Sequence, residues 1–277
     1  MAKSNSKVTP LKSQKLAASL AVASQLATVA PNLVAEALPD KVLTVQARDK
    51  QDADLALDLS ATEHQEIMAK LSSYVNGPAG HLEEQSQLYL EQQLNLILGF
   101  NVRQNLEDQQ LNHSIGIMGA EQHLMRFPGD TLAQHDAYQE AGLAPRRGAF
   151  SWFTESGELS EIDILREKYY FAVQLMYLPD WNDNYPTLKP WYKYRKMVMI
   201  NPAEQMAVVG VVADAGPAMW VQKQFGGSPE VIREGKVWSN NSQGRVMLLF
   251  VDDEEDKIPL GPIDISFAAT LARKGAS

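Results

Sequence analysis

The sequence predicts an α+β protein, in which a helical N-terminal third is followed by a small closed β-barrel. Two observations predict this order. Apolar residues recur at helical spacing before about residue 112, whereas beyond it short apolar runs are separated by glycine and proline. Hydrophobic residues make up 45% of the 277 positions, which is enough to form a sizeable core in one large domain or two small ones.

The composition excludes several classes of site and partner. The net charge of −9 argues against nucleic acid as the main partner, because phosphate binding needs clustered Lys and Arg. The absence of cysteine excludes disulfides, thiolate metal sites and cysteine nucleophiles. The five histidines form no H-E-x-x-H pattern, and we expect neither a metal ion nor another cofactor. No run of about 18 apolar residues is present, so we expect no membrane-spanning helix.

Residues 1–37 have the order of a secretory signal peptide. A basic stretch without acids, MAKSNSKVTPLKSQK, precedes the Ala-rich segment LAASLAVASQLATVA, and Ala35-Glu36-Ala37 offers a small-x-small cleavage site. This pattern predicts export, so we expect an extracytoplasmic protein, either secreted or held in the periplasm or cell envelope. The alternative is an amphipathic or disordered N-terminal tail. Residues 38–59 are predicted to be a polar linker.

Residues 60–112 are predicted to be a helical region. Ser60 lies three residues before Glu63, which is the spacing of a capping box, and apolar residues then recur every three or four positions. The sequence NGPAG at 76–80 breaks the first helix. A second helix is expected after this break, ending at Gly99. We expect this region to pack or to act as a spacer, because nothing in it has catalytic spacing.

Residues 113–277 are predicted to form the barrel. Four segments have the apolar runs and flanking turn residues of strands: RRGAFSWFTES, KMVMINP, MAVVGVVAD and RVMLLFVDD. The second and third are joined by a tight link at 204–205 and predict a hairpin. Residues 160–178 are ambiguous, since Ser160 and Asp163 suggest a helix start while the later apolar residues fit either a helix or a strand. Short strands and tight turns favour a small closed barrel.

Three of these blocks resemble the double-psi beta-barrels of rare lipoprotein A and the expansins. GAFSWFTE (148–155) resembles the opening strand, KMVMINPAEQMAVVGVVADAGP (196–217) the central hairpin that ends in Asp-x-Gly-Pro, and RVMLLFVDD (245–253) the closing strand. The resemblance implies a double-psi-like barrel that acts on polysaccharide. Lytic transglycosylases of this family cut the glycan strands of peptidoglycan, whereas expansins loosen cell walls without evident hydrolysis.

The resemblance places the family's conserved acid at Asp214. A lytic transglycosylase can use one carboxyl group first to protonate the glycosidic oxygen and then to accept a proton from the sugar's C6 hydroxyl. We therefore predict Asp214 as catalytic acid and base, with Glu155 as a second carboxylate. The alternatives are that Asp214 caps the turn that follows it and that Glu155 is a solvated charge at the end of a strand.

Aromatic residues are candidates for binding sugar rings, because the apolar faces of sugars stack on Trp and Tyr. The segment WNDNYPTLKPWYKYR (181–195) carries five aromatics, and its prolines at 186 and 190 predict an irregular, exposed loop. The alternative for any single ring is packing in the core. The predicted substrate-binding residues are Trp152, Phe153, Trp181, Trp191 and Trp220.

Together these patterns predict an exported cell-envelope protein that binds and cleaves cell-wall glycan, as a peptidoglycan lytic transglycosylase does. The cell-wall polysaccharide is the expected partner. The alternatives are a non-catalytic, expansin-like polysaccharide-binding module and a structural envelope protein. One polar stretch, HLMRFPGD, places His123, Arg126 and Asp130 close together, but no mechanism requires these three residues, and ordinary loop interactions are expected there.

Overall fold

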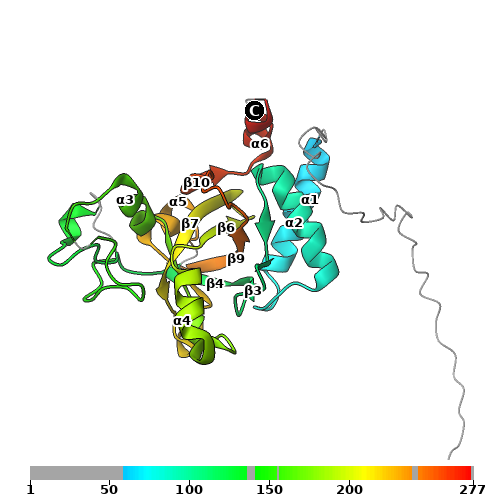
Figure 1. Ribbon diagram of the computed structural model, residues 1–277. Helices are drawn as coiled ribbons and strands as arrows, with labels where there is room; N and C mark the ends of the chain where they lie inside the picture. The colour runs from blue at the N-terminus through cyan, green and yellow to red at the C-terminus, as the bar shows by residue number, and fades with distance from the viewer. Residues whose placement is uncertain (1–58, 136–140, 155, 239–242, 276–277) are drawn as a thin grey trace, which may run out of the picture. The chain divides into compact units, whose positions relative to one another are not determined.

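The structure is a computed structural model, which describes residues 59–135, 141–154, 156–238 and 243–275. The predicted signal peptide, nearly all of the predicted linker and Glu155 lie outside these ranges. Residues 57–277 belong to one compact unit. Helices and strands both contribute to this unit, as Figure 1 shows.

The helices and strands follow one another through the described residues. The α-helices are α1 (Ala61–Val75), α2 (Glu84–Leu98), α3 (Glu161–Lys168), α4 (Trp181–Tyr192), α5 (Pro229–Glu234) and α6 (Phe267–Lys274). Short 3-10 helices are η2 (Leu132–Gln134), η3 (Leu175–Tyr177) and η4 (Met219–Val221). The strands are β1 (Val102–Arg103), β2 (Asn105–Leu106), β3 (Gln109–Gln110), β4 (Ile115–Ala120), β5 (Tyr170–Val173), β6 (Lys196–Asn201), β7 (Met206–Ala215), β8 (Phe225–Gly227), β9 (Gln243–Val251) and β10 (Gly261–Asp264).

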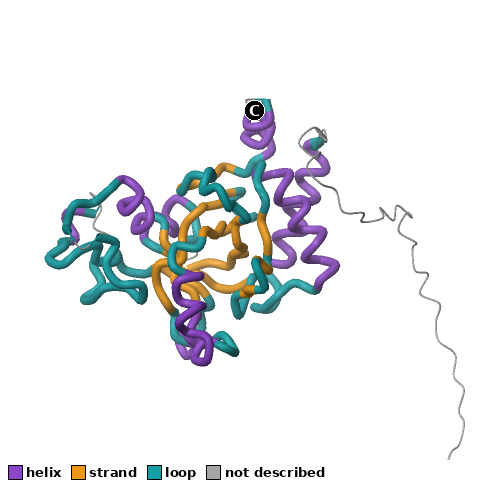
Figure 2. The backbone as a smooth tube through the Cα atoms, viewed as in Figure 1, coloured by secondary structure: helices purple, strands orange, loops and turns teal. Residues whose placement is uncertain are grey.

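Six strands close into a barrel in the order β4, β8, β5, β7, β6, β9 and back to β4. The β4–β8 and β5–β7 pairs are parallel, and the other four pairs around the ring are antiparallel. β1 adds to β9 and β10 adds to β7 outside the ring. Figure 2 shows the orange strands curling around one another. The prediction of an α+β protein with a closed barrel is therefore confirmed.

The barrel has a packed interior because side chains alternate along each strand. On β6, Met197 and Met199 belong to the cluster that gathers apolar residues from all six strands of the ring. The intervening Val198 and Ile200 belong to a second cluster on the other face of the sheet. Since successive residues of a strand point to opposite faces, the first cluster fills the barrel and the second covers its outside.

Helices α1 and α2 cover one outer face of the barrel (Figure 1). Their buried residues, among them Leu71 and Leu94, share the second cluster with apolar residues of β6 and β9. The predicted capping box is present, with the Ser60 hydroxyl accepting the Glu63 N–H at 3.2 Å. Gly99 ends α2 with φ of 81°, a left-handed conformation that glycine adopts without strain. Both helix predictions are confirmed, but the helical region ends at Leu98 and not at residue 112, because the short strands β1, β2 and β3 follow.

The predicted hairpin and closing strand are also confirmed. β6 and β7 pair in antiparallel register, with Ile200 opposite Ala207. The turn between them ends at Gln205, whose φ is 52°. The segment RVMLLFVDD supplies most of β9, which completes the ring against β6 and β4.

The prediction of an opening strand at 148–155 is wrong. Residues 148–154 form a loop with turns, and the strand that pairs with β8 and β9 is β4 at Ile115–Ala120. Ser151 has φ of 78°, which is incompatible with an extended strand. The ambiguous stretch at 160–178 contains both alternatives, because α3 is followed directly by β5.

The exposed loop predicted at 181–195 is mostly the helix α4. Its helical path is interrupted at Asn184, which has φ of −113° and ψ of 15°. Pro186 lies two residues after this kink, in the first turn of the second helical segment, where a missing N–H costs little. The proline thus restarts a helix where the sequence suggested an irregular chain. Among the described residues, no helix is both long and apolar enough to cross a membrane.

Candidate functional site

Asp214 lies near the end of β7, at an irregularity in the sheet. The parallel register between β5 and β7 shifts so that Phe171 pairs with Val212 and the next residue, Ala172, pairs with Asp214. Such a bulge redirects the side chains that follow it. The Asp214 carboxylate accepts the N–H of Ala149 at 2.8 Å, a residue 65 positions away. The observed hydrogen bond of Asp214 therefore holds a distant loop and does not cap the turn after β7.

A second carboxylate, which the sequence interpretation did not identify, lies on the same side of the barrel. Glu121 follows β4 directly, and its side chain passes over Gly226 of β8. A Cβ atom added to Gly226 would lie 2.4 Å from the Glu121 Cγ, so only glycine leaves room for this path. Between β4 and β7, the two intervening strands carry Gly226 and Ala172 at the level of Asp214. Small residues therefore separate the two carboxylates.

The charges at this site interact. Burial raises the pKa of Glu121, and the negative charge of Asp214 raises it further, while the Lys223 ammonium opposes both effects. The Lys223 Nζ lies 3.1 Å from Glu121 Oε1. The charge on Asp214 thus contributes to raising the pKa of Glu121, after the larger effects of burial and Lys223. The two carboxyl groups are positioned by strands that are far apart in the sequence.

Tyr170 lies beneath these acids and is completely enclosed. Its pKa is raised well above the ordinary range, first by burial and then by the charges of Glu121 and Asp214. Its hydroxyl donates a hydrogen bond to the carbonyl oxygen of Gln122. Tyr170 therefore stays neutral and fixes the start of the segment that follows Glu121.

Trp220 is the predicted aromatic residue that remains on the surface near Asp214. It lies in η4, after a cis peptide bond between Gly216 and Pro217, and 80% of its surface is exposed. Its neighbours Met219 and Val221 are also exposed, at 60% and 43%. The connection from β7 to β8 therefore carries an exposed apolar patch, bounded by Asp214 at one end and Lys223 at the other.

The other predicted aromatics have different surroundings. Trp181 is buried in the barrel's core cluster and cannot offer its ring to a surface ligand. Trp191 packs against Phe250 at 5.5 Å between ring centroids, and its indole N–H donates to Glu107 at 2.8 Å. Both rings therefore pack against other parts of the protein.

Trp152 and Phe153 lie in the loop that Asp214 anchors. Both are partly buried, and Phe153 stacks on Tyr194 with ring centroids 5.6 Å apart. Glu155, the predicted second carboxylate, is outside the described residues. Of the predicted site residues, Asp214 therefore lies near the end of β7 and Trp220 on the connection that follows it, while Trp152 and Phe153 lie in the loop whose Ala149 bonds to Asp214.

A buried polar cluster is formed by side chains of the long segment after β4 and by Glu167 of α3. Arg126 and Asp130 form a two-pronged ion pair, with Nε–Oδ2 and Nη2–Oδ1 distances of 2.9 Å. His135 contacts Asp130 and Glu167, and His123 also contacts Glu167. The stretch HLMRFPGD gave the sequence signal for this cluster. Its partner on α3 could not be identified from spacing, because Glu167 lies more than 30 residues further along.

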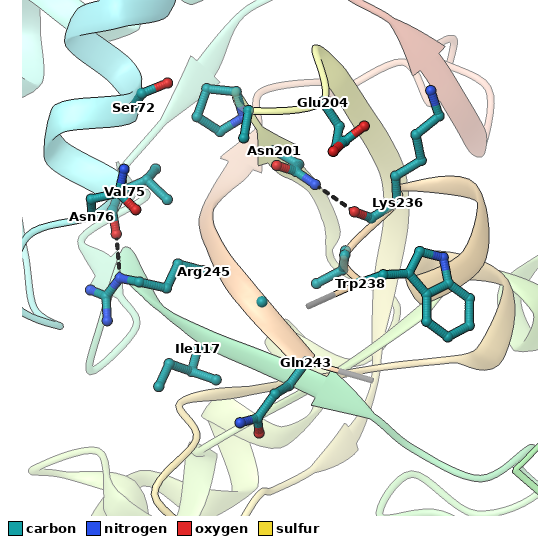
Figure 3. A pocket seen from close by; sticks show the side chains of 14 residues that line it. Ser72, Val75, Asn76, Ile117, Asn201, Glu204, Lys236, Trp238, Gln243 and Arg245 are labelled. Carbon is teal, nitrogen blue, oxygen red and sulfur yellow. Dashed lines mark hydrogen bonds between the residues drawn. The ribbon is translucent and has the colours of Figure 1, made fainter. Parts of the chain in front are cut away.

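A cavity of about 310 Å³ lies elsewhere, between the end of α1 and the turn of the β6–β7 hairpin (Figure 3). Trp238 and Glu204 are at its edge, and the Asn201 amide donates to the Lys236 carbonyl at 2.9 Å. Among the described residues that line it, Glu204 is the only carboxylate. This cavity therefore lacks a pair of acids, and we take the Asp214–Glu121 region as the candidate site.

Comparisons with known proteins do not assign a family to this chain. No model of a protein family, no curated protein and no solved structure matches it. The function is therefore argued from the residues and the geometry described above.

Proposed function

We propose that this chain is an extracytoplasmic, double-psi-like barrel protein that binds and cleaves cell-wall glycan, with Asp214 and Glu121 as its acid–base pair. The observation that carries the proposal is that the charge of Asp214 acts on Glu121, and that the connection following Asp214 carries the highly exposed Trp220. The mixed six-stranded ring and the hairpin ending in Asp-x-Gly-Pro support the resemblance to the double-psi family.

Glycan binding in this proposal begins at Trp220. An exposed indole offers a flat apolar surface to the C–H face of a sugar ring. Met219 and Val221 extend this surface, and Lys223 and the two acids provide polar contacts for hydroxyl groups. The small side chains between the strands leave the acids accessible to a chain that crosses the barrel end.

Cleavage without water requires one proton donor and one proton acceptor. The acid gives its proton to the glycosidic oxygen as the bond from that oxygen to C1 breaks. The C6 hydroxyl of the same sugar attacks C1, and its proton passes to the carboxylate partner. The products are an anhydro-sugar end and a free hydroxyl end, and proton exchange with solvent restores the pair.

The local surroundings support a division of roles between the two acids. Burial of Glu121 and the nearby charge of Asp214 favour its protonated form, as expected of a donor. Asp214 accepts the N–H of Ala149, which fixes the orientation of the carboxyl group proposed as the acceptor. The pairing rests on the strand order, in which only β8 and β5 separate β4 from β7.

The test uses purified peptidoglycan and three variants. Asp214→Asn and Glu121→Gln should each slow release of anhydro-sugar fragments by roughly 10²–10⁴-fold while pull-down on the same polymer is retained, because each removes one proton transfer. Glu158→Gln, which changes an exposed carboxylate outside the site, is the matched control and should cleave at the normal rate. Cleavage at the normal rate by both site variants would overturn the catalytic assignment.

A non-catalytic, expansin-like glycan-binding module is the second candidate. The observation that favours it is that both acids already have structural partners, Ala149 for Asp214 and Lys223 for Glu121. Binding without cleavage by the wild-type chain would select this candidate. Absence of both binding and cleavage would reject the glycan proposal altogether.

A further inference from the structure

His135 is held between two carboxylates in the buried cluster. Its Nδ1 lies 2.9 Å from Glu167 Oε2, and its Nε2 lies 3.0 Å from Asp130 Oδ2. All three side chains are at least 97% buried. A neutral imidazole has one N–H, whereas an ionised carboxylate only accepts hydrogen bonds. One of the two contacts therefore needs a further proton, on the ring or on a carboxyl group, or a metal ion.

A second imidazole faces the same carboxylate. His123 Nδ1 lies 3.2 Å from Glu167 Oε1, and the two imidazole rings are 4.7 Å apart between centroids. The candidate ligand atoms of His123, His135 and Glu167 all lie within 4.8 Å of one another. Zinc bonds of about 2.0–2.1 Å to N and O place tetrahedral ligands roughly 3.3 Å apart. The two His–Glu distances of 3.2 and 2.9 Å are close to this value, and the full set of ligand atoms spans no more than 4.8 Å.

The surroundings of His135 also resemble those of a metal ligand. A histidine bound to a metal through one nitrogen commonly donates its other N–H to a carboxylate. Asp130 is in this position, and it is itself fixed by two contacts of 2.9 Å from Arg126. This second carboxylate sets the orientation of the ring, independently of the atoms that face Glu167.

The charge of the cluster also favours a divalent cation. Among the described residues, the buried carboxylates of Asp130 and Glu167 are accompanied by one buried guanidinium, that of Arg126. If both imidazoles are neutral, the buried cluster has excess negative charge, which is costly away from water. A divalent cation offsets that excess.

We propose that His123, His135 and Glu167 bind a divalent metal ion, with zinc favoured by the nitrogen and oxygen ligands. Glu230 Oε2 lies 4.0 Å from His123 Nδ1, beside this set of ligands. The ion would tie the segment after β4 to α3. The site is enclosed, so its role is structural. This proposal is independent of glycan cleavage and departs from the sequence-based expectation that no metal binds.

The first experiment measures the metal in the full chain. Elemental mass spectrometry of the purified protein should find about one zinc per chain, as a single three-residue ligand set predicts. Removal of the ion with a chelator should lower the Tm by roughly 5–10 °C, and zinc should restore it. Co²⁺ added to the metal-free chain should give the visible absorption of a tetrahedral site.

The second experiment assigns the ligands. Glu167→Gln and His135→Asn should abolish the Co²⁺ absorption, whereas His113→Asn, a histidine outside the cluster, should keep it. Circular dichroism shows whether each variant is folded. The wild-type result decides the proposal even where a variant unfolds. A chain that binds neither zinc nor Co²⁺, and whose Tm does not change with the chelator, would overturn the metal site and leave a proton on the imidazole or on a carboxyl group.

Discussion

The side chains at the candidate site are positioned by residues that lie far away in the sequence. Asp214 is oriented by Ala149, and Glu121 lies flat over the barrel because residue 226 is glycine. Trp220 and Trp181 are the same residue type with opposite surroundings, since one is 80% exposed and the other 6%. Exposure therefore decides which ring can bind a ligand and which one stabilises the fold.

Trp220→Ala and Trp181→Ala should have opposite effects. Loss of the exposed ring should weaken polysaccharide binding roughly fivefold, since ring contacts contribute on the order of 1 kcal/mol, and leave the Tm nearly unchanged. Loss of the buried ring should cost roughly 3–5 kcal/mol of stability. Binding is measured by polymer pull-down and stability by urea unfolding.

Trp238→Ala is the control for this comparison, because Trp238 is 52% exposed and borders the separate cavity in Figure 3. It should leave binding intact. If Trp238→Ala weakens binding and Trp220→Ala does not, the ligand surface lies at the cavity and the proposed site is wrong.

Single elements are joined to the barrel by polar contacts at their ends. The Lys196 ammonium at the start of β6 lies 2.6 Å from Asp253 Oδ2, in the loop after β9. The same carboxylate accepts the N–H groups of Lys257 and Ile258. Burial opposes ionisation of Asp253, but the bond from Lys196 and the two backbone bonds outweigh burial and lower its pKa. Asp253 thus links β6 to the loop before β10.

Asp253→Asn should destabilise the protein in a pH-dependent way. The lowered pKa means that ionised Asp253 adds stability above the pKa of the unfolded chain, near 3.9, and that this stability is lost as the pH falls through the folded value. We expect a cost of roughly 1–3 kcal/mol at pH 7, shrinking toward acidic pH. Urea unfolding over a pH series measures it.

Asp256→Asn is the matched change, because Asp256 also contacts Lys196 at 2.6 Å but its side chain is 73% exposed. Its effect should stay below about 1 kcal/mol at every pH, as for other exposed ion pairs. Equal losses for the two variants would show that Asp253 gains nothing from its enclosed position.

At the scale of the whole molecule, the helices and the barrel share one core. Leu71 and Leu94 of α1 and α2 pack in the same cluster as Val198 of β6 and Leu249 of β9. The compact unit begins at Leu57, before α1. Stability is therefore expected to depend on the helices as much as on the strands, which does not fit a detachable spacer.

Two changes distinguish a shared core from a separate helical spacer. Deletion of residues 1–56 should shift the Tm by less than about 2 °C, because the described core clusters begin at Leu59. Leu94→Ala should cost roughly 2–5 kcal/mol and unfold helices and barrel together. Calorimetry checks both. Separate transitions for helices and barrel would contradict a single core.

The sequence by itself determined the features that depend on near neighbours. The Ser60–Glu63 capping box, the stop at Gly99 and the β6–β7 hairpin follow from residues a few positions apart, so their local pattern predicted them correctly. The prediction failed at 148–155 and 181–195, where aromatic composition resembled strand and loop but tertiary packing selected a loop and a helix.

The tertiary structure alone decided which chemical groups meet. Glu121 and Asp214 lie at strands separated in the ring only by β8 and β5, although the two acids are 93 positions apart in the chain. Likewise, Glu167 reaches His123 and His135 only because α3 packs against the segment after β4. Contacts of this kind depend on how distant segments share one core, and no local spacing in the sequence encodes that.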